Sequence, residues 1–442
     1  MNESQAYNPP GFQRSWIFQL LTIGVVLSLV LLPIIFNDGL APERAQWKAA
    51  RAKQLYRAGE KQTAVEMLTA ATTNSDDPLL DIQLAQWHRD AKEYDTAIEV
   101  CDSILARYQV RREGGQVEAT QMTQLSLKVV KQAIRLKAEC LILTDQKDLA
   151  IQWVSDLGAF YNDEERIGEF RKNELAYFRA VCGKQLKQAE QDIGYAFRKL
   201  NEGAGMSFVG KVCFSIGLVS RYTDQQELAI EAITSRIEVL ESRRELRAIE
   251  VNKSLYALMK RFVPLDPETY SKSNHAREQF ERYVDELATL RAVKALLLEE
   301  LERDEAASDE RHRIAELGRD ADAILRELPS DQVCLRLLGS GAQFLDTSGY
   351  VQAVQGENAL ALLELNMAVA ASEILLSSSK TSLQNTTEMQ DIEKNTEVAR
   401  RTCAVIHNHR MQAYEAESCS ELAKLERKRI VALGFEPGDD LF

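Results

Sequence analysis

Glycine and proline are scarce in this chain: there are only 21 Gly and 9 Pro in 442 residues. No Asn-Gly or Asp-Gly pair lies between alternating apolar residues, so the usual signal of a tight β-hairpin is missing. Ala, Leu, Glu, Gln, Lys and Arg, which favour helices, dominate instead. The sequence therefore predicts an all-α protein.

Paired cysteines are also missing. Seven cysteines are an odd number, they lie far apart, and no Cys-x-x-Cys motif occurs among them. This excludes disulfide scaffolds and zinc ribbons as the expected class, and most of the thiols fall on predicted apolar helix faces. They are Cys101, Cys140, Cys182, Cys213, Cys334, Cys403 and Cys419.

Positive charge is lacking in the later part of the chain. The net charge is −13. Residues 263–442 hold 33 of the 67 acidic side chains but only 20 of the 54 basic ones, so this part carries the whole excess. A phosphate backbone would be repelled there, and nucleic acid is therefore not expected as a partner.

What the chain does contain is a repeated spacing, in which a small residue is followed twelve positions later by Ala and a β-branched residue. Twelve residues separate the middles of two short antiparallel helices joined by a turn. Small side chains at both points let the two backbones approach closely. The four copies are Ala52 with Ala64, Ala85 with Ala97, Ala138 with Ala150, and Gly217 with Ala229.

The clearest copy spans 79–108 and resembles a tetratricopeptide repeat. Ala85 and Ala97 stand where that family keeps small residues, Tyr94 follows the turn, and Cys101 takes a bulky apolar position. The resemblance covers about residues 45–260, half of the chain. It implies about five helix pairs stacked as a solenoid, with a groove that binds a peptide or helix of a partner protein.

Several positions depart from that family. His88 replaces a usual tyrosine, and the copy around Ala189 has Tyr177 twelve positions earlier rather than a small residue. The longer spacing from Ala97 to Ala150 predicts an insertion around 111–123. Trp87 lies at the edge of its buried helix face, where it could anchor a partner or pack on the preceding helix pair.

An uncharged apolar run lies near the N-terminus, at residues 15–37. The 22 residues from Ser15 to Phe36 would reach roughly 33 Å in a helix, enough to cross a bilayer. A cleaved signal peptide is disfavoured because the run is too long and no clean cleavage site follows it. We therefore expect an uncleaved signal anchor that spans the membrane once, carrying Trp16, Leu21, Val25, Leu29, Pro33 and Phe36.

The side of the membrane that holds the body is left open. Five basic residues on the body side of the span, against Arg14 alone on the other, slightly favour a cytoplasmic body. Long domains often escape this charge rule, however, and Asp38 and Glu43 lie nearest to the span. The five are Arg44, Lys48, Arg51, Lys53 and Arg57.

Pro264 and Pro267 mark a boundary, and Pro267 suits the first turn of a new helix. Apolar stripes at 280–301 and 314–328 predict an antiparallel helix pair, with homodimerisation through it as an alternative. Further helices are expected at about 357–376 and 388–433, with Gly434 as the cap of the second. The predicted organisation is a flexible tail (1–14), the membrane helix (15–37), the repeat solenoid (43–262), a C-terminal helical region (268–434) and a tail (435–442).

Motifs that could carry chemistry are weak. Residues 205–211 match most of a phosphate-binding loop, but Val212 follows where a hydroxyl is needed, and no buried strand precedes it. Residues 339–341 (Gly-Ser-Gly) are expected in a loop or a helix interruption. His407 and His409 are two apart, so they point to different sides of a helix and cannot share a metal ion.

No catalytic residue, cofactor or metal is therefore predicted. The expected function is that of a non-catalytic membrane-anchored scaffold or adaptor, whose repeat groove binds an unknown partner protein beside the lipid bilayer. The alternative is a structural membrane protein that self-associates through its C-terminal helices as a homo-oligomer.

Overall fold

The computed structural model describes residues 41–438, apart from gaps at 74, 76, 114–115, 119–122, 163–167, 202–205, 243–266, 327–328, 330 and 383–388. The predicted membrane helix and its residues Trp16, Leu21, Val25, Leu29, Pro33 and Phe36 lie outside the described residues. The chain divides into two compact units, residues 1–160 and 161–442, and each is described by itself.

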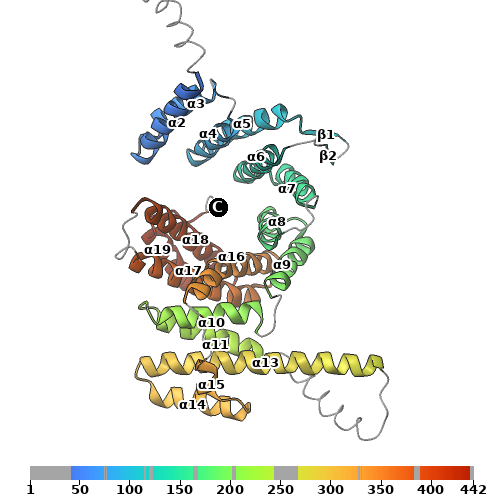
Figure 1. Cartoon of the computed structure of the whole chain (residues 1–442), viewed down its shortest axis with the longest axis vertical. Helices are drawn as coiled ribbons and strands as arrows, with labels where there is room; N and C mark the ends of the chain where they lie inside the picture. The colour runs from blue at the N-terminus through green and yellow to red at the C-terminus, as the bar shows by residue number, and fades with distance from the viewer. Residues whose placement is uncertain are drawn as a thin grey trace, which may run out of the picture. The chain divides into compact units, whose positions relative to one another are not determined.

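The first unit is made of helix pairs (Figure 1). Each pair joins two helices through a turn of three residues or so, as the twelve-residue spacing predicts. The pairs are α2 (Ala41–Arg57) with α3 (Lys61–Thr72), α4 (Pro78–Asp90) with α5 (Tyr94–Arg107), and α6 (Gln124–Leu143) with α7 (Lys147–Asn162). Two of these helices begin at residues that favour helix starts: Asp77 caps α4 ahead of Pro78, and Thr123 caps α6.

An insertion separates α5 from α6, as expected, but it contains strands rather than helix. Strand β1 (Arg111–Glu113) pairs antiparallel with β2 (Gln116–Glu118), in a register that places Arg112 opposite Val117. The all-α prediction missed this short hairpin because only Asn-Gly and Asp-Gly were considered as turn signals, whereas the sequence between the strands is Gly114-Gly115. The fold class stays all-α, since every other described element is a helix.

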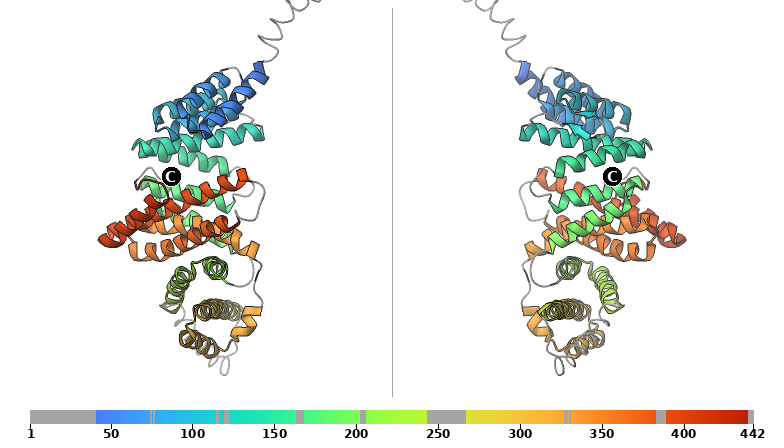
Figure 2. Two further views of the ribbon diagram at one scale, coloured as in Figure 1. Left: turned by 90° about the vertical axis from the view of Figure 1, so that its left-hand side faces the viewer. Right: turned by 90° about the vertical axis from the view of Figure 1, so that its right-hand side faces the viewer.

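The second unit continues with helices only. In Figure 2, α10, α11, α13 and α14 are seen end-on, while α17 and α18 lie across the view, so the two groups cross steeply. The helices are α8 (Glu169–Cys182), α9 (Leu186–Leu200), α10 (Phe208–Ser220), α11 (Gln226–Ser242), α13 (Pro267–Glu300), α14 (Asp304–Glu316), α15 (Ala321–Arg326), α16 (Asp331–Val354), α17 (Asn358–Ser382), α18 (Met389–Ala416) and α19 (Ser420–Ala432).

The core of this unit joins helices from both sides of Pro264. Side chains of α10 and α11 share one buried cluster with side chains of α13, α16 and α17. The apolar stripe of α13 is part of that cluster through Leu290 and Leu297, which are fully buried. The predicted antiparallel pair is confirmed: α14 folds back along α13 and buries Ile314 against Ala288 and Ala292.

Three sequence expectations are wrong in detail. The helix expected over 388–433 is two helices, α18 and α19, which break at Ser418 in the left-handed conformation (φ 60). The stripe expected over 314–328 is also broken, at Gly318 (φ 70) between α14 and α15. Gly339-Ser340-Gly341 lies inside the unbroken helix α16 rather than in a loop. An added Cβ at Gly341 would lie 2.5 Å from Val212 of α10. That glycine permits close helix packing.

Among the described residues, one helical stretch, Asn358–Ser378 of α17, is long and apolar enough to cross a membrane. The buried share of its most apolar window is 56%, and α16 and α18 pack against α17. Core helices of this kind pass the same hydropathy test as membrane spans.

Candidate functional site

The eight small residues of the repeated spacing are all buried. The alanines at 52, 64, 85, 97, 138, 150 and 229 are 0% exposed. Gly217 is buried too, and an added Cβ there would lie 2.3 Å from Cγ1 of Val293 and 2.9 Å from Cδ1 of Ile233. At Gly217 the neighbouring helices are therefore too close for a larger side chain.

The same spacing continues beyond residue 262, where the sequence interpretation overlooked it. Ala295 and Ala307 are twelve apart and buried in α13 and α14, and so are Gly349 and Ala361 in α16 and α17. In each case a residue with positive φ, Glu302 or Gly356, lies seven positions after the first small residue. Gly59, Lys92 and Asp145 hold that same place in the first unit. One helix-turn-helix unit is thus reused along the chain.

The pair formed by α8 and α9 departs from the twelve-residue spacing by one residue. Ala176 of α8, thirteen positions before Ala189 of α9, is buried with it in one cluster. Tyr177, which occupies the expected place, instead lies against Tyr350 and His409. A search for thirteen as well as twelve would have found this copy.

Trp87 is buried, with 6% of its surface exposed. Its ring stacks on Tyr56 of α2 with centroids 4.3 Å apart and planes 9° from parallel. The ring therefore packs on the preceding helix pair, which was one of the two interpretations of this residue. The other is corrected, since a ring covered by Tyr56 is not available to anchor a partner.

The first helices of successive pairs are joined by polar contacts in the first unit. Tyr56 Oη of α2 donates to Asp90 Oδ2 of α4 at 3.2 Å. Arg89, next to Asp90, pairs with Glu139 of α6, and Arg135 Nε donates to the other oxygen of Glu139 at 3.0 Å. We call these five residues the A-helix row.

Charge and burial hold the A-helix row together. Burial alone would lower the pKa of Arg89, but the carboxylates of Glu139 and Asp90 more than offset it and raise that pKa above its ordinary value. Glu139 is buried, whereas Asp90 and Arg135 remain exposed. The row thus fixes α2, α4 and α6 side by side and leaves charged groups of both signs at the surface.

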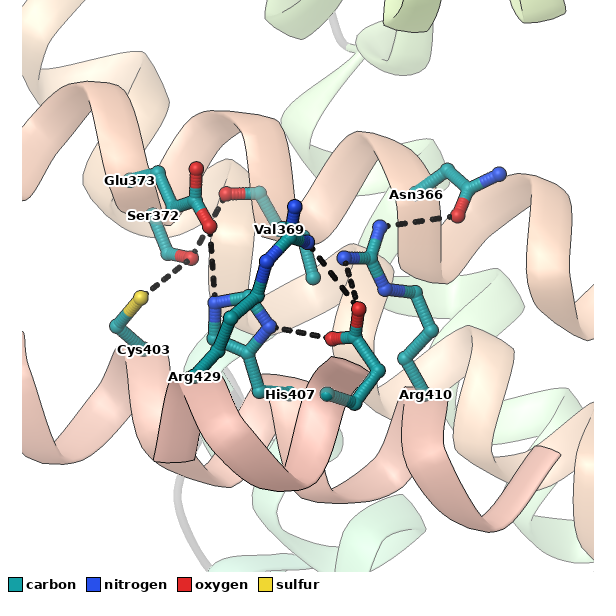
Figure 3. A network of polar contacts seen from close by, with 9 residues as sticks. Asn366, Val369, Ser372, Glu373, Cys403, His407, Arg410 and Arg429 are labelled. Atoms are coloured by element: carbon teal, nitrogen blue, oxygen red, sulfur yellow. Dashed lines mark hydrogen bonds and ion pairs between the residues drawn. The ribbon is translucent and has the colours of Figure 1, made fainter. Parts of the chain in front are cut away.

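A second group of polar residues, which the sequence interpretation missed, lies inside the second unit (Figure 3). His407 of α18 is 1% exposed and sits between two carboxylates. Its Nδ1 lies 2.6 Å from Glu426 of α19, and its Nε2 lies 3.0 Å from Glu373 of α17. Arg410 and Arg429 also pair with Glu426, at 2.9 and 3.1 Å.

This network keeps His407 protonated. Burial lowers the pKa of His407, but hydrogen bonds to Cys403, Glu373 and Glu426 outweigh it and raise the pKa to about 10. Burial opposes ionisation of Glu373 and Glu426 as well, yet their pKa values are lowered, because His407 and the nearby arginines favour the carboxylates. An imidazolium with both nitrogens donating has no lone pair for a base or a metal. The network is therefore an ionic joint between α17, α18 and α19.

His409 faces the other way on α18, as two-residue spacing requires. Its Nδ1 lies 2.8 Å from Asp346 of α16, and its ring stacks on Tyr350 at 4.2 Å. The Nε2 lies 3.5 Å from Tyr177 Oη of α8. The two histidines thus contact different neighbours, as predicted. In the part of the chain that the structure describes, no three His, Cys, Asp or Glu side chains are placed to hold a metal ion.

The match to a phosphate-binding loop has another explanation. Ser207 caps α10 by accepting from Gly210 N at 3.0 Å, and its own N–H donates to Oε2 of Glu286 at 2.9 Å. An added Cβ at Gly210 would lie 2.5 Å from Cδ of Glu286. Arg236 completes the group through a buried ion pair of 2.7 Å with Glu286. The anion at this helix N-terminus is a carboxylate from the chain itself.

The cysteines behave as small apolar residues. All seven are free, and all except Cys419 are buried. Burial raises the pKa of Cys140 and of Cys213 to about 12, which keeps both thiols protonated at neutral pH. Thiols in this state are not nucleophiles.

Comparison with known proteins adds little. No protein-family model matches the chain, and no curated protein matches it. Among solved structures, it is similar to a chain of the "APC/C hetero-tetramer Cut9-Hcn1", with 11% identity over 92% of this chain and 96% of that one. The TM-score is 0.27, which is too low to show a shared fold.

Proposed function

We propose that the chain is a non-catalytic scaffold of the tetratricopeptide type, held at a membrane by residues 15–37, that binds a partner protein through the exposed side of α2, α4 and α6. The A-helix row is the observation that carries this proposal. It fixes three helices side by side as one rigid surface, and preformed surfaces bind with a smaller entropic cost.

Exposed side chains around the row supply the contacts. Lys53 lies one turn before Tyr56 on α2, and Gln86 lies one turn before Asp90 on α4; both are exposed. Arg135 is exposed on α6. A surface with separate positive and negative groups suits a polar or mixed-charge peptide or helix. The anchor would concentrate that partner at the membrane.

Photo-crosslinking in the native membrane tests this proposal. A crosslinking amino acid is placed at Gln86 or Lys53 in the full chain, with Ser103, exposed on α5, as the matched control position. We expect an adduct of one defined mass from the first two positions and not from Ser103. Equal adducts from all three positions, or none from Gln86 and Lys53, would contradict binding at this surface.

Self-association through the C-terminal helices was the alternative. The apolar stripe that suggested it is used within the chain, since Leu290 and Leu297 of α13 are buried against the chain's own helices. Dimerisation through that stripe would require α13 to leave its core. We therefore retain the scaffold as the proposed function.

A further inference from the structure

Helix α2 carries far more positive than negative charge. Between Arg44 and Gly59 the sequence has five basic residues and no acidic one. Glu43 in the first turn is the one acidic residue of α2, so the helix has five basic side chains against one acidic side chain. Ala45, Ala49 and Ala52 bury one side of the helix, and the charges lie on the rest.

The basic residues fall into two groups on the exposed side. The first group, which we call the outer stripe, consists of Arg44, Trp47, Lys48 and Arg51. At 100° per residue, these side chains lie within about 100° of one another around the helix axis. Lys53 and Arg57 lie about 130° or more from the middle of that stripe, toward the A-helix row. The helix therefore presents two separate basic edges.

Trp47 is the feature that packing leaves unexplained. It is 66% exposed, the largest exposure among the bulky apolar side chains of the described residues. Arg44 and Arg51 flank it on the same stripe and are exposed, and Lys48 beside it is half-buried. Tryptophan with lysine and arginine on one helix face is the composition that settles at a membrane interface.

The outer stripe also begins close to the predicted span. Five peptide steps separate Phe36 from Ala41, and even fully extended they reach no further than about 18 Å. Helix α2 itself is 17 residues, or roughly 25 Å, long. If residues 15–37 cross the bilayer, α2 cannot move beyond the headgroup layer and its immediate surroundings.

We infer that the outer stripe of α2 binds the surface of a bilayer rich in anionic phospholipid headgroups, with Trp47 entering the interface. This inference rests on the proposed anchor. Charge complementarity selects the occupant, because anionic headgroups attract each nearby Lys or Arg with about 1 kcal/mol. The contact would fix how the repeat surface is presented at the membrane, and it leaves Lys53 and Arg57 for the partner.

Quenching of Trp47 by brominated lipid tests the inference. The full chain is reconstituted in bilayers of brominated phosphatidylcholine with or without phosphatidylserine, and the signal of W47F is subtracted to remove the other tryptophans. We expect Trp47 to be quenched in the bilayer with phosphatidylserine and much less without it. Raising NaCl from 0.1 to 1 M, which shortens the screening length from about 10 to about 3 Å, should abolish the difference.

Charge variants on the two edges of the same helix provide the matched control. The double variant K48Q/R51Q should lower the docking equilibrium about 30-fold, whereas K53Q/R57Q, with the same loss of charge, should leave quenching nearly unchanged. Equal effects of the two double variants would overturn the assignment to the outer stripe. Trp47 that stays unquenched in both bilayers would overturn membrane contact and point to an acidic macromolecule instead.

Flotation separates this inference from the anchor. The full chain is mixed with vesicles of phosphatidylcholine alone, which offer no anionic charge and so report only on the apolar segment 15–37. A chain that does not float with them contradicts the anchor. A chain that floats while Trp47 remains unquenched in phosphatidylserine bilayers keeps the anchor and contradicts the role of α2.

Discussion

Single glycines decide how closely the helices pack in the second unit. At Gly217 the nearest atom to an added Cβ, Val293 Cγ1, would be at 2.3 Å, whereas at Gly194 of α9 it would be Arg198 Nη1 at 3.7 Å. The two glycines lie in helices of one unit, but only the first is held by a neighbouring helix. Their substitutions should therefore have opposite signs.

We expect Gly217→Ala to destabilise the protein by about 1–3 kcal/mol, because the added methyl forces α10 away from α13. Gly194→Ala, the matched control, should be neutral or stabilise by up to about 1 kcal/mol through helix propensity. Urea unfolding of the full chain in detergent measures both. A Gly217→Ala variant as stable as Gly194→Ala would contradict the close approach.

His407 makes stability depend on pH in the alkaline range. Its pKa is raised from 6.5 to about 10, so the folded protein holds a proton that the unfolded chain loses above about pH 6.5. The contribution of His407 is therefore complete below pH 6.5 and is lost as the pH rises through 10. Acid destabilises the same network by another route. The pKa values of Glu373 and Glu426 are lowered, so these groups stabilise the fold while they are ionised, and that contribution is lost when acid protonates them.

We expect His407→Gln to cost about 3–5 kcal/mol at pH 6.5, since it leaves two buried carboxylates without the imidazolium. The difference from the unsubstituted chain should shrink steadily between pH 7 and 10. His312→Gln is the control, because His312 is exposed on α14 and its pair with Glu316 is worth well under about 1 kcal/mol. Denaturation midpoints measured at several pH values give the stability lost in each variant. A loss for His407→Gln that does not change with pH would contradict the ionic joint.

At the scale of elements, the start of α10 is held by a carboxylate from α13. Glu286 bonds to Ser207 N and to Arg236, and both members of the ion pair are buried. The exposed pair of Arg303 with Glu227 connects the turn between α13 and α14 to α11, but solvent screens it. The buried contact, rather than the number of ion pairs, should determine how α10, α11 and α13 stay together.

Glu286→Gln should destabilise the second unit by about 3–5 kcal/mol, because Arg236 is left buried without its partner. Glu227→Gln, which breaks an exposed pair between the same two regions, should cost less than about 1 kcal/mol. Thermal unfolding of the full chain compares them. Similar shifts for both variants would show that Glu286 does not anchor the helix start.

At the scale of the whole molecule, the chain divides into two compact units. Each has its own buried cluster: Ala52, Ala64 and Leu68 belong to the first, and Gly217 packs beside Ile233 in the second. Domains with separate cores unfold in separate transitions unless a large interface couples them.

We expect two calorimetric transitions, and one substitution in each unit should identify them. Ala85→Leu overpacks the contact between α4 and α5 and should lower only one midpoint, by the equivalent of about 1–3 kcal/mol. His407→Gln should lower only the other. If either substitution moved both transitions equally, the two units would be one cooperative body.

The sequence by itself determined the helical class, the spacing of the helix pairs and the turns between them. These follow from local properties: the scarcity of Gly and Pro, and the small residues twelve apart. They can be read from one chain because an antiparallel pair with a short turn involves only neighbouring residues. The overlooked pairs, Ala295 with Ala307 and Gly349 with Ala361, follow the same local rule.

Only the tertiary structure decided which polar residues meet. Glu373, His407 and Glu426 come from three helices, and Ser207 meets Glu286 across 79 positions. No periodicity marks such contacts, because their partners are set by the packing of distant helices. The same holds for Trp87, whose two interpretations were separated only when Tyr56 was found stacked on its ring. Local spacing defines the repeated unit, and long-range packing gives each copy its own contacts.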